Sequence, residues 1–393
     1  MSLPDERKEM TEPMWSQRCY PLDWLRVLTI LTVFVFHSGR FFDQTDWNVK
    51  SAAVYPGVQA WTQFLSSWLM PIIFVISGAS LFYAIGKAGA LAFVRDKVFR
   101  LLIPFLVGVF THIALQVYLE RIPHHQFSGS FFAFYPHYFD GMYGYGGNFA
   151  WMGLHLWYLL ALFVFSLAVF PLLHLLKGPA ASLLDKIGNF LALPGLIFLL
   201  MAPVLWLAVA LNPQSFLGDS RSGGWPLPIY LLYLIYGFVI FSNASLREQI
   251  RKMRIVYLVG AFVASAVMFR QYDYVAPPRE TLSFLYFASL RIVSAWCWIL
   301  TFIGFALQWL NTNNAFLKYA NQAVLPFYIV HQTVLVLFGY LILPWQAPDL
   351  VKWFLIAAGA FAVSLGLYEF AVRRFDILRI LFGMKTIAQP RQQ

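Results

Sequence analysis

The chain has 393 residues, of which 60% are hydrophobic and only 12% are charged, and its formal net charge is +10. This composition excludes a water-soluble globular protein, because too few charged residues are present to cover its surface, and it excludes an intrinsically disordered chain. Only two cysteines, Cys19 and Cys297, are present, so a disulfide scaffold is excluded as well. The composition therefore predicts a multi-pass membrane protein.

Ten apolar segments approach the length of about 20 residues that a helix needs to cross the hydrocarbon of a bilayer. Each is a continuous apolar run rather than an alternation of apolar and polar residues, which favours helices over the strands of a membrane barrel. We therefore predict an all-α polytopic membrane protein with about ten transmembrane helices. The expected spans are residues 22–39, 62–85, 101–119, 153–176, 190–211, 226–242, 255–269, 283–309, 319–343 and 353–372.

The distribution of Lys and Arg predicts the orientation of these spans. Both terminal tails and the even-numbered connections carry 19 of the 28 basic residues, against seven on the opposite side, so both termini are expected in the cytoplasm. The positive charge is thus a topology signal and gives no reason to expect a nucleic-acid partner. We divide the chain into a cytoplasmic tail (1–21), a membrane domain (22–372) and a basic cytoplasmic tail (373–393). Since no cleavage site of small residues follows it, the first span is expected to remain as a signal anchor.

One connection, residues 120–152, is much longer than the others and is rich in glycine and aromatic residues. Long loops in compact folds are often functional, and aromatic faces can stack on sugar rings. A belt of aromatic side chains at the membrane surface explains the same composition equally well. Both interpretations stay open for this outer loop.

The first span contains the clearest pair of polar residues. Arg26 and His37 are eleven residues apart, which at about 100° per residue is close to three full turns and a rise of about 16 Å. They therefore share one face, and because ionisable side chains are costly in lipid, that face should line the protein interior or a wet cavity. The alternatives are an interfacial Arg26 paired with Asp23 and a core His37 bonded to a backbone carbonyl.

Other ionisable residues extend this pattern. A basic cluster that contains Lys97 and Arg100 precedes the third span; it suits phosphate oxygens, and equally suits anchoring to lipid phosphates. Within or at the mouths of later spans lie His112, His155, Arg291 and His331. Each alone is typical of a structural hydrogen bond, but together they indicate a polar cavity that can be approached from both sides.

Motifs for other chemistry are absent. The sequence has no nucleotide-binding P-loop, dinucleotide fingerprint, nucleophile elbow or zinc-protease motif. His124, His125 and His137 have no cysteine or acidic partner at ligand spacing, so no metal is expected.

These residues resemble a known family. Leu22 to Arg26 with His37 is similar to the Arg-x10-His motif of the membrane family called acyltransferase 3, in particular the branch that includes glucan biosynthesis protein C. The family's Arg-x-x-Arg pair is similar to Lys97-Val98-Phe99-Arg100, with Lys in place of the first Arg, so bidentate phosphate recognition is lost there. Further similar segments are Ile76 to Gly78, His155 to Leu159, Tyr328 to Gln332 and Leu378 to Gly383.

The resemblance implies transfer of an acetyl- or succinyl-type group from cytoplasmic acyl-coenzyme A to a hydroxyl of an extracytoplasmic sugar or glycan, across the inner membrane of a bacterium. Acyl-coenzyme A is then a substrate and no permanent cofactor is expected; the other expected partners are the acceptor, membrane lipids and a second copy of the chain. We expect catalysis by His37, whose ordinary pKa of about 6.5 suits a general base, with Arg26 and Asp23. Lys97, Arg100 and Arg26 are expected to bind the donor. The expected acceptor contacts are His112, His155, Trp157, Arg291 and His331.

Two alternatives remain at this point. An acyl-enzyme on His37 or Ser77 competes with direct transfer. A transporter or flippase for a glycan or a lipid-linked substrate would have a similar composition, although no inverted repeat is evident. A purely structural role would not explain why two side chains that are costly in a membrane, Arg26 and His37, share one face of the first span.

Overall fold

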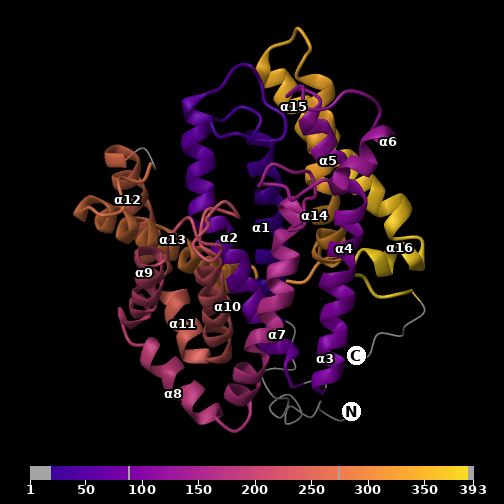
Figure 1. Cartoon of the computed structure of the whole chain (residues 1–393). Helices are drawn as coiled ribbons and strands as arrows, with labels where there is room; N and C mark the ends of the chain where they lie inside the picture. The colour runs from indigo at the N-terminus through magenta and orange to yellow at the C-terminus, as the bar shows by residue number, and fades with distance from the viewer. Residues whose placement is uncertain (1–18, 87–88, 273–274, 388–393) are drawn as a thin grey trace.

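The computed structural model describes residues 19–86, 89–272 and 275–387, and within these ranges all the regular elements are helices (Figure 1). The helices are α1 (Tyr20–Gly39), α2 (Pro56–Ala84), α3 (Ala90–Lys97), η1 (Val98–Leu102), α4 (Ile103–Phe110), α5 (His112–Arg121), α6 (Phe131–Phe134), η2 (Tyr135–Phe139), η3 (Leu154–Leu156), α7 (Trp157–Lys177), α8 (Ala181–Leu191), η4 (Leu196–Leu200), α9 (Met201–Ala210), α10 (Leu227–Ser242), α11 (Ala244–Lys252), α12 (Arg254–Tyr272), α13 (Leu282–Trp309), α14 (Ala315–Ile342), α15 (Asp349–Leu367), η5 (Tyr368–Val372) and α16 (Asp376–Leu381).

In the described ranges, eight helical stretches are long and apolar enough to cross a membrane, and ten if each of two bent pairs counts as one span. The predicted all-α fold with about ten spans is therefore confirmed. The cytoplasmic placement of both termini and the limits of the two tails stay predictions.

Two pairs of helices in the middle of the chain are sharply bent. The expected span 190–211 bends by 115° between α8 and the stretch Leu196–Ala210. Pro194 at this break has no N–H to donate, and Gly195 adopts a left-handed φ of +80°, so a helix cannot continue through them. The second bend, of 99°, lies between α10 and α11, where the side chain of Asn243 accepts a hydrogen bond from Leu246 N (2.9 Å) and starts a new helix.

Two central helices, α2 and α10, approach each other unusually closely. A Cβ atom added to Gly78 would lie 1.7 Å from the carbonyl oxygen of Leu234, and one added to Gly237 would lie 1.9 Å from that of Val75. Only glycine leaves room for two backbones at this distance, which is the role that small residues play in membrane helix packing. Helix packing therefore gives a reason for the glycine in the Ile76 to Gly78 segment that is independent of any catalytic role.

We expect Gly78→Ala to destabilise the protein by about 1–3 kcal/mol, because a methyl group cannot fit against the carbonyl of Leu234 without moving α10. Thermal unfolding of the protein in detergent measures this loss as a lower Tm. Gly57→Ala in the same helix is the matched control, since nothing lies within 4 Å of its added Cβ. Equal Tm values for the two variants would contradict this account of the contact.

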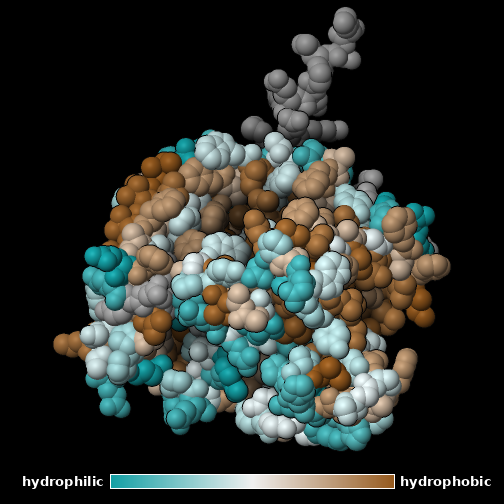
Figure 2. All heavy atoms as spheres, turned by 90° about the horizontal axis from the view of Figure 1, so that it is seen from above, coloured by the Kyte–Doolittle hydropathy of each residue, from teal (hydrophilic) through white to brown (hydrophobic). Residues whose placement is uncertain are grey.

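Three long connections lie on one side of the helices and are called here the loop face: residues 40–55, 122–153 and 211–226. The connection that follows α1 crosses the top of the molecule in Figure 1, above α1 and α2. Seen from above, hydrophilic side chains gather over the middle and the lower part of the molecule, and apolar ones over its upper part (Figure 2). The loop face also exposes large apolar side chains, among them Phe132, Phe216 and Leu217, so its surface is mixed in character.

Candidate active site

A cavity of about 700 Å³ extends into the bundle between the three connections of the loop face. At depth it reaches His37 of α1 and His155 of η3, and Trp157 at the start of α7 lies beside them. Its wall is both aromatic and polar. The aromatic lining residues include Trp47, Tyr143, Tyr145, Trp151, Trp157 and Phe216.

Four histidines from distant parts of the sequence meet at the inner end of this cavity. The ring of His331 lies 5.1 Å from that of His37 and 5.2 Å from that of His155, centroid to centroid. The ring of His112 lies 6.2 Å from that of His155. These histidines come from four separate helices, α1, α5, η3 and α14, which the fold brings together. His37 and His155 line the cavity, while His112 and His331 lie behind its wall.

His37 is held on one side and open on the other. Its Nδ1 lies 2.9 Å from Nε2 of His331, and its ring stacks on Trp47 at 6.2 Å with an interplanar angle of 5°. Among the described residues, none hydrogen-bonds to its Nε2. An imidazole fixed at one nitrogen and open to a cavity at the other is the arrangement that a general base requires.

The remaining histidines are tied into a buried network with α14. Nε2 of His155 lies 3.0 Å from the carbonyl oxygen of Ile329, and its Nδ1 lies 3.4 Å from Nε2 of Gln116. Gln116 also donates to Thr333 Oγ1 (2.6 Å), which in turn lies 2.7 Å from Nδ1 of His112. Sequence reasoning missed Gln116 and Thr333; their polarity inside apolar spans was the available signal.

Arg26 lies at the other end of the same face of α1. Its guanidinium donates to Asp23 Oδ1 (3.2 Å), Asn321 Oδ1 (3.1 Å) and Ser80 Oγ (2.8 Å), and thereby joins α1 to α2 and α14. Since Arg26 and His37 both contact α14, the face predicted from their spacing is turned toward protein. Arg26 does not line the cavity that contains His37. Sequence reasoning missed Ser80 and Asn321.

Lys97 directly precedes a π-helical turn, η1, and Arg100 lies within it. Its defining bond runs from Ile103 N to Val98 O, five residues back. Pro104 has no N–H for the carbonyl of Arg100, so regular α-helical bonding is interrupted there. Lys97 lies 3.7 Å from Asp96 Oδ2 and over the ring of Phe93, whereas the exposed Arg100 side chain forms no ion pair within the described ranges.

Arg291 supports the wall of the cavity rather than facing into it. Its Nη2 donates to the carbonyl oxygen of Gly224 (2.7 Å), and its guanidinium lies 3.9 Å from the ring centroid of Trp225. Trp225 in turn donates to the carbonyl oxygen of Ser67 (3.0 Å). Together, Trp225 and Arg291 therefore anchor the 211–226 connection to α2 and to α13.

A carboxylate that the sequence did not reveal lies near the mouth of the cavity. Glu120 Oε2 accepts hydrogen bonds from Asn48 (2.6 Å) and from the Tyr143 hydroxyl (2.8 Å), and Arg121 pairs with Oε1 (2.9 Å). Burial and the negative charge of Glu120 raise the pKa of Tyr143, which therefore remains a hydrogen-bond donor. This cluster joins two connections of the loop face.

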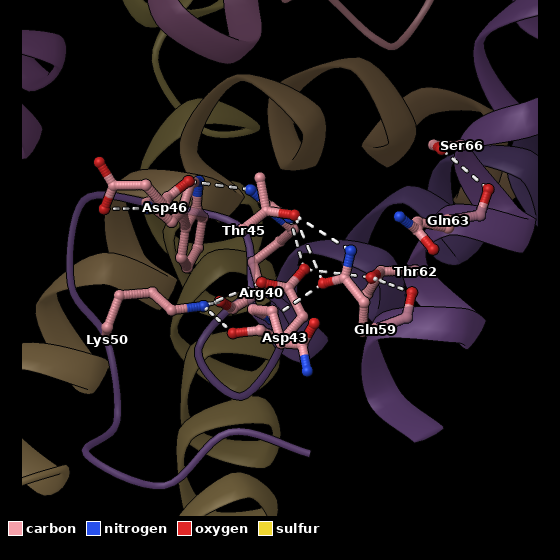
Figure 3. Close-up of polar contacts among 11 residues, drawn as sticks. Arg40, Asp43, Thr45, Asp46, Lys50, Gln59, Thr62, Gln63 and Ser66 are labelled. Carbon is pink, nitrogen blue, oxygen red and sulfur yellow. Dashed lines mark hydrogen bonds and ion pairs between the residues drawn. The ribbon is translucent and has the colours of Figure 1, made fainter. Parts of the chain in front are cut away.

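A second ionic cluster fixes the connection that directly follows His37 (Figure 3). Asp43 is fully buried, pairs with Arg40 and with Lys50 Nζ (2.8 Å), and accepts a hydrogen bond from Thr62 of α2 (3.1 Å). Burial lowers the pKa of Lys50, and the hydrogen bond from Lys50 to Asp43 opposes this shift. Because Arg40 also lines the cavity, the cluster holds one wall of the site in place.

In the part of the chain that the structure describes, no group of three or more His, Cys, Asp or Glu side chains is placed to hold a metal ion. His124 on the loop face lies 2.7 Å from the carbonyl oxygen of Glu120, and His137 pairs with Asp140 (2.9 Å). The clustered histidines are instead bonded to one another, to backbone carbonyls and to side-chain hydroxyl and amide groups.

Comparison with known proteins gives matches over nearly the whole chain. A family model described as an acyltransferase domain matches residues 20–369. Proteins called Glucans biosynthesis protein C from Salmonella schwarzengrund (strain CVM19633), Salmonella typhi and Salmonella typhimurium (strain LT2) are each 23% identical over 384 residues. These matches cover 94% of this chain and 95% of each relative. No solved structure matches the chain significantly.

Proposed function

Because the chain belongs to the acyltransferase domain family, we propose that it transfers an acetyl- or succinyl-type group from acyl-coenzyme A to a hydroxyl of an extracytoplasmic sugar or glycan. One observation supports this proposal above the others: His37, whose Nε2 is hydrogen-bonded by none of the described residues, lies at the inner end of an aromatic cavity that opens on the loop face. The relatives named for glucan biosynthesis favour a glycan as the acceptor. The inner membrane of a bacterium is the proposed location.

The acceptor end of the site is the cavity itself. Sugars are bound by aromatic faces together with side chains that hydrogen-bond to hydroxyl groups. The cavity offers Trp47, Trp151 and Trp157 for the first purpose, and Glu120 and Arg121 near its mouth for the second. A glycan entering from the loop face would bring a hydroxyl group to Nε2 of His37.

The donor end is the cationic region near the start of α1. Arg100, Lys97 and Arg26 supply positive charge for the phosphates of coenzyme A. The pantetheine arm, about 20 Å long, is comparable with the rise of about 16 Å from Arg26 to His37 along α1. A donor bound in this way would bring its thioester to the imidazole from the side opposite the acceptor.

The proposed reaction is a direct transfer. Nε2 of His37 takes the proton of the acceptor hydroxyl while the hydroxyl oxygen attacks the thioester carbonyl, a carbon–oxygen bond forms, and the carbon–sulfur bond breaks. The proton on His37 then passes to the departing thiolate of coenzyme A. Ser77 is a poorer nucleophile for an acyl-enzyme route, because its hydroxyl is bonded to Ile73 O (2.8 Å) and Tyr158 (2.7 Å) and does not line the cavity.

The test uses purified protein in proteoliposomes with acyl-coenzyme A labelled in the acyl group and glucan oligosaccharides as acceptors. Label recovered on the sugar, with one free thiol released for each acyl group transferred, is the expected result. Movement of unmodified glycan into the vesicles without label transfer would overturn the proposal and indicate a transporter.

Arg100→Ala is expected to raise the KM for acyl-coenzyme A about tenfold, which corresponds to the loss of one charge-assisted hydrogen bond to a phosphate. Its kcat should change little, because the side chain is remote from His37. Steady-state kinetics with the donor varied measure both constants. Lys186→Ala, which removes an exposed positive charge from α8, is the control. An unchanged KM in the Arg100 variant would remove this residue from the donor site.

A further inference from the structure

The hydrogen bonds of His331 determine which of its nitrogens carries the proton. Its Nδ1 lies 2.6 Å from the backbone carbonyl oxygen of Tyr328. A carbonyl oxygen can only accept a hydrogen bond, so Nδ1 of His331 must be protonated. A neutral imidazole has one N–H, and Nε2 of His331 is therefore an acceptor.

The protonation of His331 in turn fixes the tautomer of His37. The group that faces the acceptor nitrogen of His331 is Nδ1 of His37, at 2.9 Å. Nδ1 of His37 must therefore donate, and its Nε2 carries the lone pair. Nε2 is the nitrogen without a partner among the described residues, and His37 lines the cavity. The chain of bonds from the Tyr328 carbonyl through His331 thus presents a base at the nitrogen that can meet a substrate.

The other histidines of the cluster do not present a base to the cavity in this way. His155 lines the cavity, but both of its ring nitrogens are engaged, one by the carbonyl of Ile329 and the other by the amide of Gln116. Nε2 of His112 has no hydrogen-bond partner in the part of the chain that the structure describes, but that atom is buried and the residue does not line the cavity. His37 is therefore distinguished from its neighbours by its bond to His331.

We propose that His331 is a positioning residue that holds His37 in the tautomer with a basic Nε2 and stabilises the imidazolium formed when that nitrogen takes a proton. When His37 becomes positively charged, its bond to His331 becomes charge-assisted and stronger, so the stabilisation appears as the reaction proceeds. His331 is itself fully buried and locked by the Tyr328 carbonyl, and the hydroxyl of Tyr328 is bonded to the backbone of His155. This role rests on the proposed acyl transfer and differs from the acceptor contact expected from the sequence.

Two variants of His331 test the proposal. His331→Leu removes the acceptor, and we expect kcat to fall about 10- to 100-fold, part of the factor of about 10²–10⁴ that a general base supplies. The KM values for acyl donor and glucan should stay within about twofold, because the residue lies behind the cavity wall. His331→Gln restores an acceptor, its amide oxygen, and its kcat should exceed that of His331→Leu at least threefold.

Thr333→Val is the matched control. Thr333 is buried on the same helix and its hydroxyl bonds His112 and Gln116, so this variant also loses buried hydrogen bonds without altering the contact with His37. Its kcat should exceed that of His331→Leu at least tenfold when both are assayed as folded, monodisperse protein. Wild-type kcat in His331→Leu, or equal losses in the Leu and Gln variants, would overturn the role of His331. Failure of the wild-type protein to label glucan would instead overturn the proposed function.

Discussion

His37→Ala is expected to lower kcat for acyl transfer by about 10²–10⁴-fold, because the variant has no group in reach of the acceptor hydroxyl that can take its proton. His37 lines the cavity, so water can occupy the space that the ring leaves and the fold should persist. Labelled acyl-coenzyme A with glucan in detergent measures the rate, and size-exclusion chromatography confirms the folded state.

The matched control for this experiment is His174→Ala. His174 is exposed near the end of α7, stacks on Phe170, and has no part in the proposed chemistry. It should keep wild-type activity. Wild-type activity in His37→Ala would contradict the proposed general base, whereas a loss of folded protein in both variants would show that the assay reports stability.

Asp43→Ala is expected to destabilise the protein by about 3–5 kcal/mol, which is the usual cost of removing one partner from a buried ionic group. Arg40 and Lys50 would then face each other without the carboxylate that they share, and Thr62 would lose an acceptor. The fall in Tm, measured in detergent, reports this loss. The connection after α1 should also become more sensitive to limited proteolysis.

Asp140→Ala is the control for Asp43, because Asp140 pairs with His137 at an exposed position of the loop face. An exposed pair contributes about 0–1 kcal/mol, so its Tm should stay near that of the wild type. Equal Tm values for the two aspartate variants would show that the buried cluster does not hold the connection in place.

The part of the site that follows helical periodicity could be predicted from the sequence. A separation of eleven positions places Arg26 and His37 on one face whatever surrounds α1, and because charge in lipid is costly, that face is expected to point into the protein. What the face contacts depends on how the helices are arranged. Asn321 and His331 are almost 300 residues further along the chain, and no local pattern in an apolar span predicts that they meet α1.

The mouth of the cavity was even less predictable. Glu120 falls at the end of an apolar segment and reads as an ordinary boundary residue, yet it becomes buried because Asn48 and Tyr143 from two connections close around it. Arg291 shows the opposite outcome. An arginine inside an apolar span predicts a functional contact, but this one is occupied by the backbone of Gly224 and the ring of Trp225.

The π-helical turn at Val98–Leu102 sets the orientation of the residues that directly follow it in the third span. Such a turn accommodates one residue more than regular winding does, so the positions of α4 that follow it are rotated by about 100° relative to an uninterrupted α-helix, up to the break at Thr111. His112 and Gln116 lie on α5, beyond a second break in the helix at Thr111, and contact Thr333 there, while Arg100 lies exposed within the turn. A single-residue deletion within the turn would therefore rotate the side chains of α4 by about 100° about the helix axis relative to α3.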